Sequence, residues 1–174
     1  MKKLIPLFFL PVIVLYYSSC KKDTVVAPPD FSKITETDSS CLYNGNIDST
    51  DWGNDANWSA QELSLLGFKD TFPILDSTFG FVQVSAACNN PNNGVFIVGT
   101  DVQKECTMKV AVVNKQMQIL HYNTYKLTGG PIIHGFNFAG NTAFHPNEYY
   151  RLYYGFYNFK DSLFYKGHGD FRIE

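Results

Sequence analysis

The stretch that decides the fold is YYRLYYGFYN, residues 149–158. Large apolar residues recur in it at every second position, which is the pattern of a strand with two different faces. Leu152, Tyr154 and Phe156 share one face and are predicted to enter a core. The opposite face must either pack against a second layer or be exposed, and it carries Tyr149, Tyr153 and Tyr157.

The same signature recurs through the second half of the chain, where β-branched and aromatic residues are bounded by turn residues. It predicts strands at 79–88, 95–99, 107–113, 116–122, 131–138, 149–158 and 163–173. We find no internal repeat of fixed period. The body of the protein is therefore predicted to be mainly β.

The residues just before the deciding strand carry a family resemblance. Residues 144–158 resemble the turn and following strand of immunoglobulin-like and fibronectin type III sandwiches, with Pro146 and Asn147 at the turn. Tyr150 matches the tyrosine whose hydroxyl bonds back across that corner. The resemblance implies an antiparallel immunoglobulin-like β-sandwich that ends in a hairpin over 149–173, with a bulge expected at Gly167 and Gly169. Strand order in the N-terminal half is left open.

One short helix is predicted on the N-terminal side, over residues 59–66. Ser59 and Glu62 have the spacing of a capping box, in which each side chain accepts from the other residue's backbone N–H. Trp58 and Leu63 stand at the positions of a hydrophobic staple, and Gly67 suits the end of the helix. Trp58 is therefore assigned a structural role in preference to a sugar-stacking one.

The first residues have the layout of a secretory signal, because Lys2 and Lys3 precede an uncharged segment over 4–17. That segment is shorter than the roughly 20 apolar residues that span a bilayer. It also contains Pro6 and Pro11, each of which removes a helical N–H. A permanent transmembrane anchor is therefore not expected.

Tyr17-Ser18-Ser19-Cys20 resembles the lipobox of bacterial lipoproteins, although that family usually has Leu at the position of Tyr17. The resemblance implies cleavage before Cys20 and acylation of its sulfur, and two or more acyl chains hold a protein stably on a membrane. The alternative is an ordinary signal peptide. The composition is similar to that of Bacteroidota lipoproteins, so we expect a cell-envelope, outer-membrane location, with the membrane face left open.

Three parts of the chain are expected: a signal peptide over 1–19, a lipidated flexible tether over 20–40 and a β-sandwich domain over 41–174. Loss of the two lysines in 1–19 from 14 basic residues leaves 12 against 16 acidic ones, a net charge of −4. Nucleic acid is disfavoured as a partner, because phosphate contacts need clustered Lys and Arg.

After acylation of Cys20 the chain keeps Cys41, Cys88 and Cys106. An oxidising envelope would pair two of them. Cys88 with Cys106 closes the shortest loop and is the preferred pair, although a plain meander would separate them along the strands.

Metal sites are not predicted. Residues 43–51, YNGNIDSTD, resemble the second half of a dockerin-type calcium loop that ends at Asp51, but Ser40 and Leu42 stand where the first half needs ligand oxygens. A hydrated turn is favoured. The histidines occur singly, without HxH or HExxH spacing: His121, His134, His145 and His168.

Enzymatic motifs such as GxSxG, a P-loop or GxGxxG are missing from the sequence. The first functional hypothesis is a non-catalytic, lipid-anchored binding module for a glycan or an envelope protein, with no cofactor. Its candidate ligand contacts are aromatic: Trp52, Tyr149, Tyr153 and Tyr157. The alternatives are an envelope enzyme with a site near His168 and Asp170, and a metal-binding lipoprotein.

Overall fold

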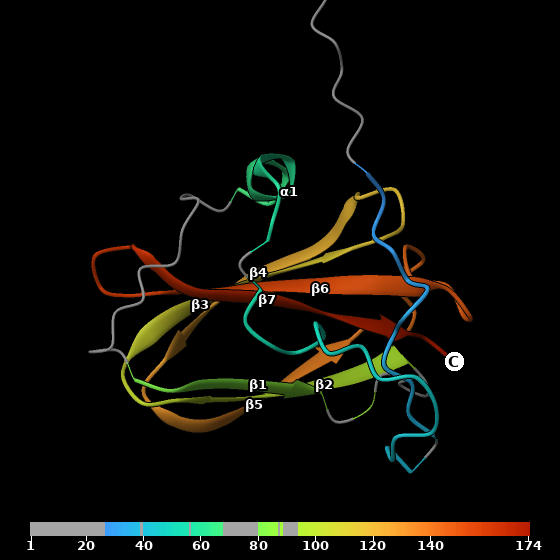
Figure 1. Ribbon diagram of the computed structural model, residues 1–174, viewed down its shortest axis with the longest axis horizontal. Coiled ribbons are helices and arrows are strands. Elements are labelled where there is room, and N and C mark those ends of the chain that lie inside the picture. Colours follow the sequence, from blue (N-terminus) through green and yellow to red (C-terminus); the bar gives the residue numbers. More distant parts are fainter. Residues whose placement is uncertain (1–26, 39, 56, 68–79, 87, 89–93) are drawn as a thin grey trace, which may run out of the picture.

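The computed structural model describes residues 27–38, 40–55, 57–67, 80–86, 88 and 94–174. These contain one short helix and strands in two antiparallel sheets (Figure 1). The elements are α1 (Ala60–Leu65), β1 (Val82–Ala86), β2 (Val95–Val102), β3 (Cys106–Val113), β4 (Ile119–Leu127), β5 (Gly130–Asn137), β6 (Tyr149–Tyr157) and β7 (Leu163–Arg172). Every predicted strand is present, and β4 starts and ends later than expected.

The two sheets face each other as a β-sandwich, which confirms the predicted fold class. Their strand orders are β1-β2-β5 and β4-β3-β6-β7. In Figure 1 the three-stranded sheet lies below the four-stranded sheet, and α1 lies above both. The outer face of the four-stranded sheet is therefore covered over β3, β6 and β7, whereas most of β4 is exposed.

The core between the sheets is largely aromatic. Phe96 of β2 stacks on Phe171 of β7 with ring centroids 4.4 Å apart, and Phe138 stacks on Phe144 at 4.1 Å. Leu152, Tyr154 and Phe156 face this core as predicted. At the corner before β6, the Tyr150 hydroxyl accepts a 2.6 Å hydrogen bond from the backbone N–H of His145, which confirms the predicted corner.

The outer face of β6 is buried beneath the helix. Tyr153 and Tyr157 lie in one buried cluster with Trp58, Leu63 and Leu66, and Trp58 meets the Tyr153 ring edge-on at 4.9 Å. Of the two alternatives for this face, packing against a second layer is therefore the one observed. The helix α1 is too short to be stable alone. The burial of whole aromatic rings beneath it stabilises it through tertiary packing.

The capping box of α1 is confirmed. Ser59 Oγ accepts from the N–H of Glu62 at 3.1 Å, and the Glu62 carboxylate accepts from the N–H of Ser59 at 2.7 Å. The other Glu62 oxygen accepts from the Tyr153 hydroxyl at 2.7 Å. Glu62 therefore ties the start of the helix to the sheet beneath it.

The bulge expected at Gly167 and Gly169 is wrong, because both residues pair regularly with β6 and the only register shift in that ladder falls at Phe156/Tyr157. The glycines instead let another segment approach closely. A Cβ on Gly167 would collide with the carbonyl oxygen of Gly53, and one on Gly169 would collide with the indole of Trp52. Residues 51–55 thus run along β7 in the space that the missing side chains leave.

This segment also covers the edge of β7. The N–H of Trp52 donates to the carbonyl of His168 at 2.8 Å, and the N–H of Asp55 donates to the carbonyl of Lys166 at 2.9 Å. An uncovered strand edge is a template for unwanted pairing. Here the protein's own chain occupies that edge.

The predicted disulfide is wrong. Cys88 pairs with Cys41, 47 positions away, and Cys106 is a free, buried thiol. The reason is topological, because Cys106 begins β3 in the four-stranded sheet whereas Cys88 follows β1 in the other sheet. Burial raises the pKa of the Cys106 thiol to about 11.

The packed body begins earlier than residue 41, where the tether was predicted to end. Ile34, Thr35 and Thr37 are buried, and Phe31 stacks on Tyr149 at 5.7 Å. Residues 1–26, which include the predicted signal peptide and Cys20, lie outside the described residues. In the part of the chain that is described, no helix has the length and apolar character needed to cross a membrane.

Candidate functional site

A cleft of about 390 Å³ lies between the N-terminal segment and the edge of β1. One wall is strand β1, and the other is the chain from Thr35 to Trp52, drawn blue to cyan in Figure 1. The side chains and backbone that line it are Thr35, Thr37, Cys41, Tyr43, Ile47, Asp48, Ser49, Asp51, Trp52, Gln83, Val84, Ser85 and Ala86. The lining thus joins aromatic, aliphatic and hydrogen-bonding groups, as ligand sites do.

The β1 wall presents backbone groups that have no partner among the described residues. The N–H of Gln103 donates to the carbonyl of Phe81, so these two residues form a hydrogen-bonded pair next to the β1–β2 ladder. The hydrogen-bonded pairs of the ladder then fall at every second position from Phe81. In an antiparallel pair every second residue turns both backbone groups toward its neighbour, so Gln83 and Ser85 bond to β2. Val84 and Ala86 consequently turn their N–H and C=O groups toward the cleft.

The opposite wall is a small hairpin over residues 36–46. Glu36 exchanges backbone hydrogen bonds with Asn44 and Asn46, and the Asp38 carboxylate accepts from the N–H groups that follow it. Thr35 and Asp48 are tied by bonds of 2.9 and 3.3 Å that involve the Thr35 hydroxyl. Short-range polar bonds of this kind make the wall a defined structure without a core of its own.

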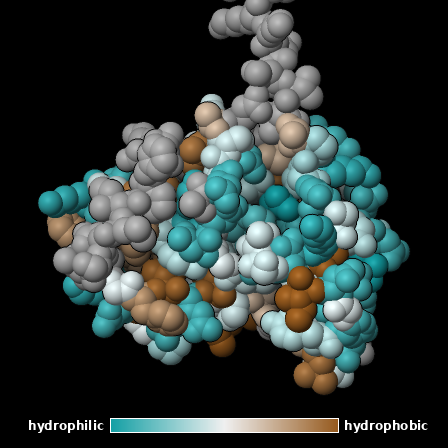
Figure 2. Space-filling model, viewed as in Figure 1, coloured by the Kyte–Doolittle hydropathy of each residue, from teal (hydrophilic) through white to brown (hydrophobic). Residues whose placement is uncertain are grey.

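The disulfide Cys41–Cys88 joins the two walls at one end of the cleft. Near it, Tyr43 and Ile47 remain 71% and 67% exposed. Figure 2 shows brown, apolar side chains on the lower part of this face, where Figure 1 places the three-stranded sheet and this loop. Large exposed apolar side chains held in a rigid loop are typical of recognition surfaces.

Asp51 anchors the base of the cleft. Its two oxygens accept from the N–H of Asp170 at 3.0 Å and the N–H of Thr35 at 3.1 Å. Burial and the nearby Asp170 carboxylate raise the pKa of Asp51 to about 6. Asp170 is fully buried and forms a two-pronged ion pair with Arg151, at 2.7 and 2.8 Å. The guanidinium therefore offsets one of the two buried carboxylates.

His168 and Lys166 lie on the same outer face of β7 as Asp170. His168 Nδ1 lies 3.0 Å from an Asp55 carboxylate oxygen, and this bond lowers the pKa of Asp55. Lys166 is fully buried with its Nζ 5.0 Å from the centre of the Trp58 ring, and burial lowers its pKa. These groups bind the covering segment to the sheet and are not aimed into the cleft.

Of the candidate ligand contacts, the cleft contains only Trp52. Tyr153 and Tyr157 are buried beneath α1, so they are not surface ligand contacts. Tyr149 lines a separate depression with Lys115 and His145. Gln83, Ser85 and the edge of β1 could not be predicted as site residues, because a strand pattern does not tell which strand lies at an edge.

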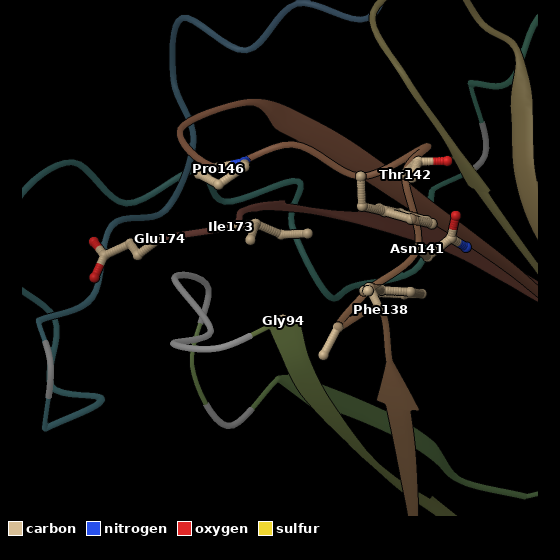
Figure 3. Close-up of a pocket in the computed structure, with 10 residues that line it drawn as sticks. Gly94, Phe138, Asn141, Thr142, Pro146, Ile173 and Glu174 are labelled. Carbon is tan, nitrogen blue, oxygen red and sulfur yellow. The ribbon is translucent and has the colours of Figure 1, made fainter.

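A larger cavity, about 510 Å³, lies at the end of the sandwich near Gly94 and Ile173 (Figure 3). Phe138 and Phe144 are among its lining residues, and the Glu174 carboxylate points away from the other labelled residues in Figure 3. This cavity offers apolar surface with little hydrogen-bonding specificity, so the smaller cleft is the stronger candidate site.

No group of three or more His, Cys, Asp or Glu residues within the described ranges is arranged to hold a metal ion. His121 and His134 contact aromatic rings at the sheet interface, and burial lowers the pKa of both. Their positions are those of packing residues.

No family model and no curated protein matches this chain. Among solved structures, a β-glucuronidase from Parabacteroides merdae is similar over 55% of this chain, at 11% identity and a TM-score of 0.36. A β-glucuronidase from glycoside hydrolase family 2 is similar over 53%, at 10% identity and a TM-score of 0.35. The chain spans 13% and 11% of the lengths of those two proteins.

Proposed function

We propose that this chain is a lipid-anchored envelope lipoprotein whose sandwich is a non-catalytic binding module for a glycan or a protein partner. The observation that carries the binding role is the cleft beside β1, where exposed Tyr43 and Ile47 stand across from polar Gln83 and Ser85. Aromatic, apolar and hydrogen-bonding groups together give both affinity and orientation to a bound molecule.

The state of the titratable groups favours binding over catalysis. His168 and Asp170, the pair named for the enzyme alternative, are buried and bonded to Asp55 and Arg151. A general acid or base has to reach the proton that it transfers. Since both groups already hold the fold together, the enzyme alternative has no observation in its favour.

The anchor role rests on Cys20 and its lipobox-like surroundings. Two or more acyl chains at this sulfur would hold the protein on the envelope, which we propose to be the outer membrane. Intact-mass analysis of the native protein tests this. The expected mass is that of residues 20–174 plus acyl chains, with recovery in the detergent phase, and a Cys20→Ser variant should lose both properties. An unmodified thiol in the native protein would refute the anchor.

The binding role is tested with purified mature protein on glycan and peptide arrays. We expect saturable binding that Ser49→Arg abolishes, because Ser49 is an exposed residue of the cleft lining and a long cationic side chain there would obstruct the cleft. Thr124→Arg, an exposed position on β4 in the other sheet, is the matched control and should bind as the wild type does. Turnover by the wild-type protein in a broad hydrolase panel, or stoichiometric metal after purification, would contradict the proposal.

A further inference from the structure

The unpaired edge of β1 identifies the kind of molecule that the cleft accepts. We propose that an extended peptide segment of a partner protein binds there and adds to β1 as a further strand of the three-stranded sheet. This inference rests on the proposed binding function and names the partner class for the same site. It concerns main-chain recognition, in which backbone bonds supply affinity and side-chain pockets supply specificity.

The backbone of β1 offers hydrogen-bonding groups to such a partner. Val84 turns its N–H and C=O toward the cleft, and within the described residues no group bonds to either of them. The Val84 side chain packs in the core, so the low exposure of this residue, 5%, reflects its side chain. Its backbone groups face the cleft, where water or a peptide can pair with them. An added strand would satisfy Val84 and Ala86 together, since both present their groups on the same side.

The other sheet edges are less suited to this role. The edge of β7 is occupied by the N–H groups of Trp52 and Asp55. The edge of β5 carries Pro131, which cannot donate a hydrogen bond, and Ile133 there is 77% exposed. The edge of β1 differs from both, because no bond between described residues occupies it and a second wall lies across the cleft.

The lining predicts the character of the peptide. Asp48 and Asp51 line the cleft, and the described residues that line it include no Lys, Arg or His. Tyr43 and Ile47 add exposed apolar surface at the hairpin wall. Because side chains alternate along a strand, we expect a peptide that alternates β-branched residues with Lys or Arg.

The test uses the full mature chain in detergent and an array of synthetic 12-residue peptides that alternate Val, Ile or Thr with Lys or Arg. We expect at least one peptide to bind. Two versions of it are then compared, one N-methylated at the odd positions and one at the even positions. Their affinities should differ, because only one row of amides faces β1. One version should bind about tenfold or more weaker and the other should bind nearly normally. Equal binding of both versions would overturn main-chain pairing.

Amide hydrogen exchange gives a test that needs no variant. In the free protein the Val84 amide should exchange faster than those of Gln83 and Ser85, which bond to β2, and the bound peptide should slow it. Unchanged exchange at Val84 in the presence of a bound peptide would overturn the proposal.

Proline scanning adds a matched pair of variants. Ala86→Pro removes an N–H that faces the cleft and leaves the β1–β2 bonds intact, so peptide affinity should fall about tenfold. Ile133→Pro removes an outward N–H from the other edge of the same sheet and should leave affinity unchanged. Loss of affinity in Ile133→Pro alone would place the peptide elsewhere. If Ala86→Pro fails to fold, the exchange and N-methyl results decide.

The glycan array separates the two proposals. A glycan that binds in the cleft, with no peptide binding, overturns the peptide inference and leaves the binding module standing. Binding of neither class overturns both.

Discussion

Replacing Gly169 by Ala tests how the covering segment is held on β7. A Cβ at this position would clash with three atoms of the Trp52 indole, so the ring must move. Moving it breaks the contact with Phe96, whose ring centroid lies 5.6 Å away. The backbone of Gly169 is in an ordinary strand conformation, which means that any cost comes from this collision.

The expected magnitude follows from packing. Overfilling a packed site costs about 1–3 kcal/mol, and complete loss of a buried Trp costs about 3–5 kcal/mol. Since Trp52 is partly exposed, we expect about 2–3 kcal/mol for Gly169→Ala and a similar loss for Trp52→Ala. The melting temperature should fall by about 5–10 °C for each variant.

The double variant gives the decisive measurement. With Trp52 truncated, Gly169→Ala should add less than about 0.5 kcal/mol, so the two changes are strongly coupled. Gly135→Ala, on an exposed strand position with no atom within 4 Å of the new Cβ, is the control and should change stability by less than about 0.5 kcal/mol. Equilibrium urea unfolding of the mature chain, with the disulfide intact, measures all four variants. An equal cost of Gly169→Ala with and without Trp52 would refute this account.

Three further predictions concern charge and sulfur. The pKa of Asp51 in the folded protein is raised to about 6, so its contribution to stability is present below the unfolded pKa and is lost as pH rises through about 6. Between pH 4 and pH 7.5, the free energy of unfolding of Asp51→Asn should therefore rise by about 2 kcal/mol relative to that of the wild type, as measured by urea unfolding. A difference between the two proteins that does not change with pH would contradict this. Double Ser substitution of Cys41 and Cys88 should lower the free energy of unfolding by up to about 4 kcal/mol, because their disulfide closes a loop with a sequence separation of 47. The buried thiol of Cys106 should react with a thiol reagent only after unfolding. Lys166→Met should be neutral or stabilising by about 1 kcal/mol at pH 7, since an apolar side chain carries no buried charge, and a loss above about 2 kcal/mol would show that the ammonium has a stabilising partner.

Local patterns predicted the elements because the forces that form them are local. Alternation placed Leu152 and Tyr154 on the core face of β6, and four capping signals placed the helix at Ser59. The tyrosine corner was also predictable, since the His145–Tyr150 bond spans five positions. In each case the interacting residues are near in sequence or share a simple period.

The errors came from contacts between distant segments. Nothing in the sequence near Cys88 indicates that residues 36–46 fold back across β1, so the pairing of Cys88 with Cys41 could not be predicted. Likewise, Gly167 and Gly169 were correctly singled out as unusual, but their cause was the approach of Gly53 and Trp52 from over 100 positions away. A glycine pattern indicates that another group approaches the backbone closely, but it does not indicate which group that is.

The N-terminal segment makes these long-range contacts, and it contacts two strand edges in different ways. It satisfies the edge of β7 through the backbone of Trp52 and Asp55, yet it stands off from β1 and leaves a cleft there. A chain that only had to protect its edges would gain by pairing with both. The disulfide and the Thr35–Asp48 bonds instead fix the shape of the hairpin wall, and no bond between described residues occupies the outward groups of Val84. Covalent and polar restraints that keep an edge accessible are what a strand-accepting site requires, since the partner then meets a preformed slot and little ordering cost remains.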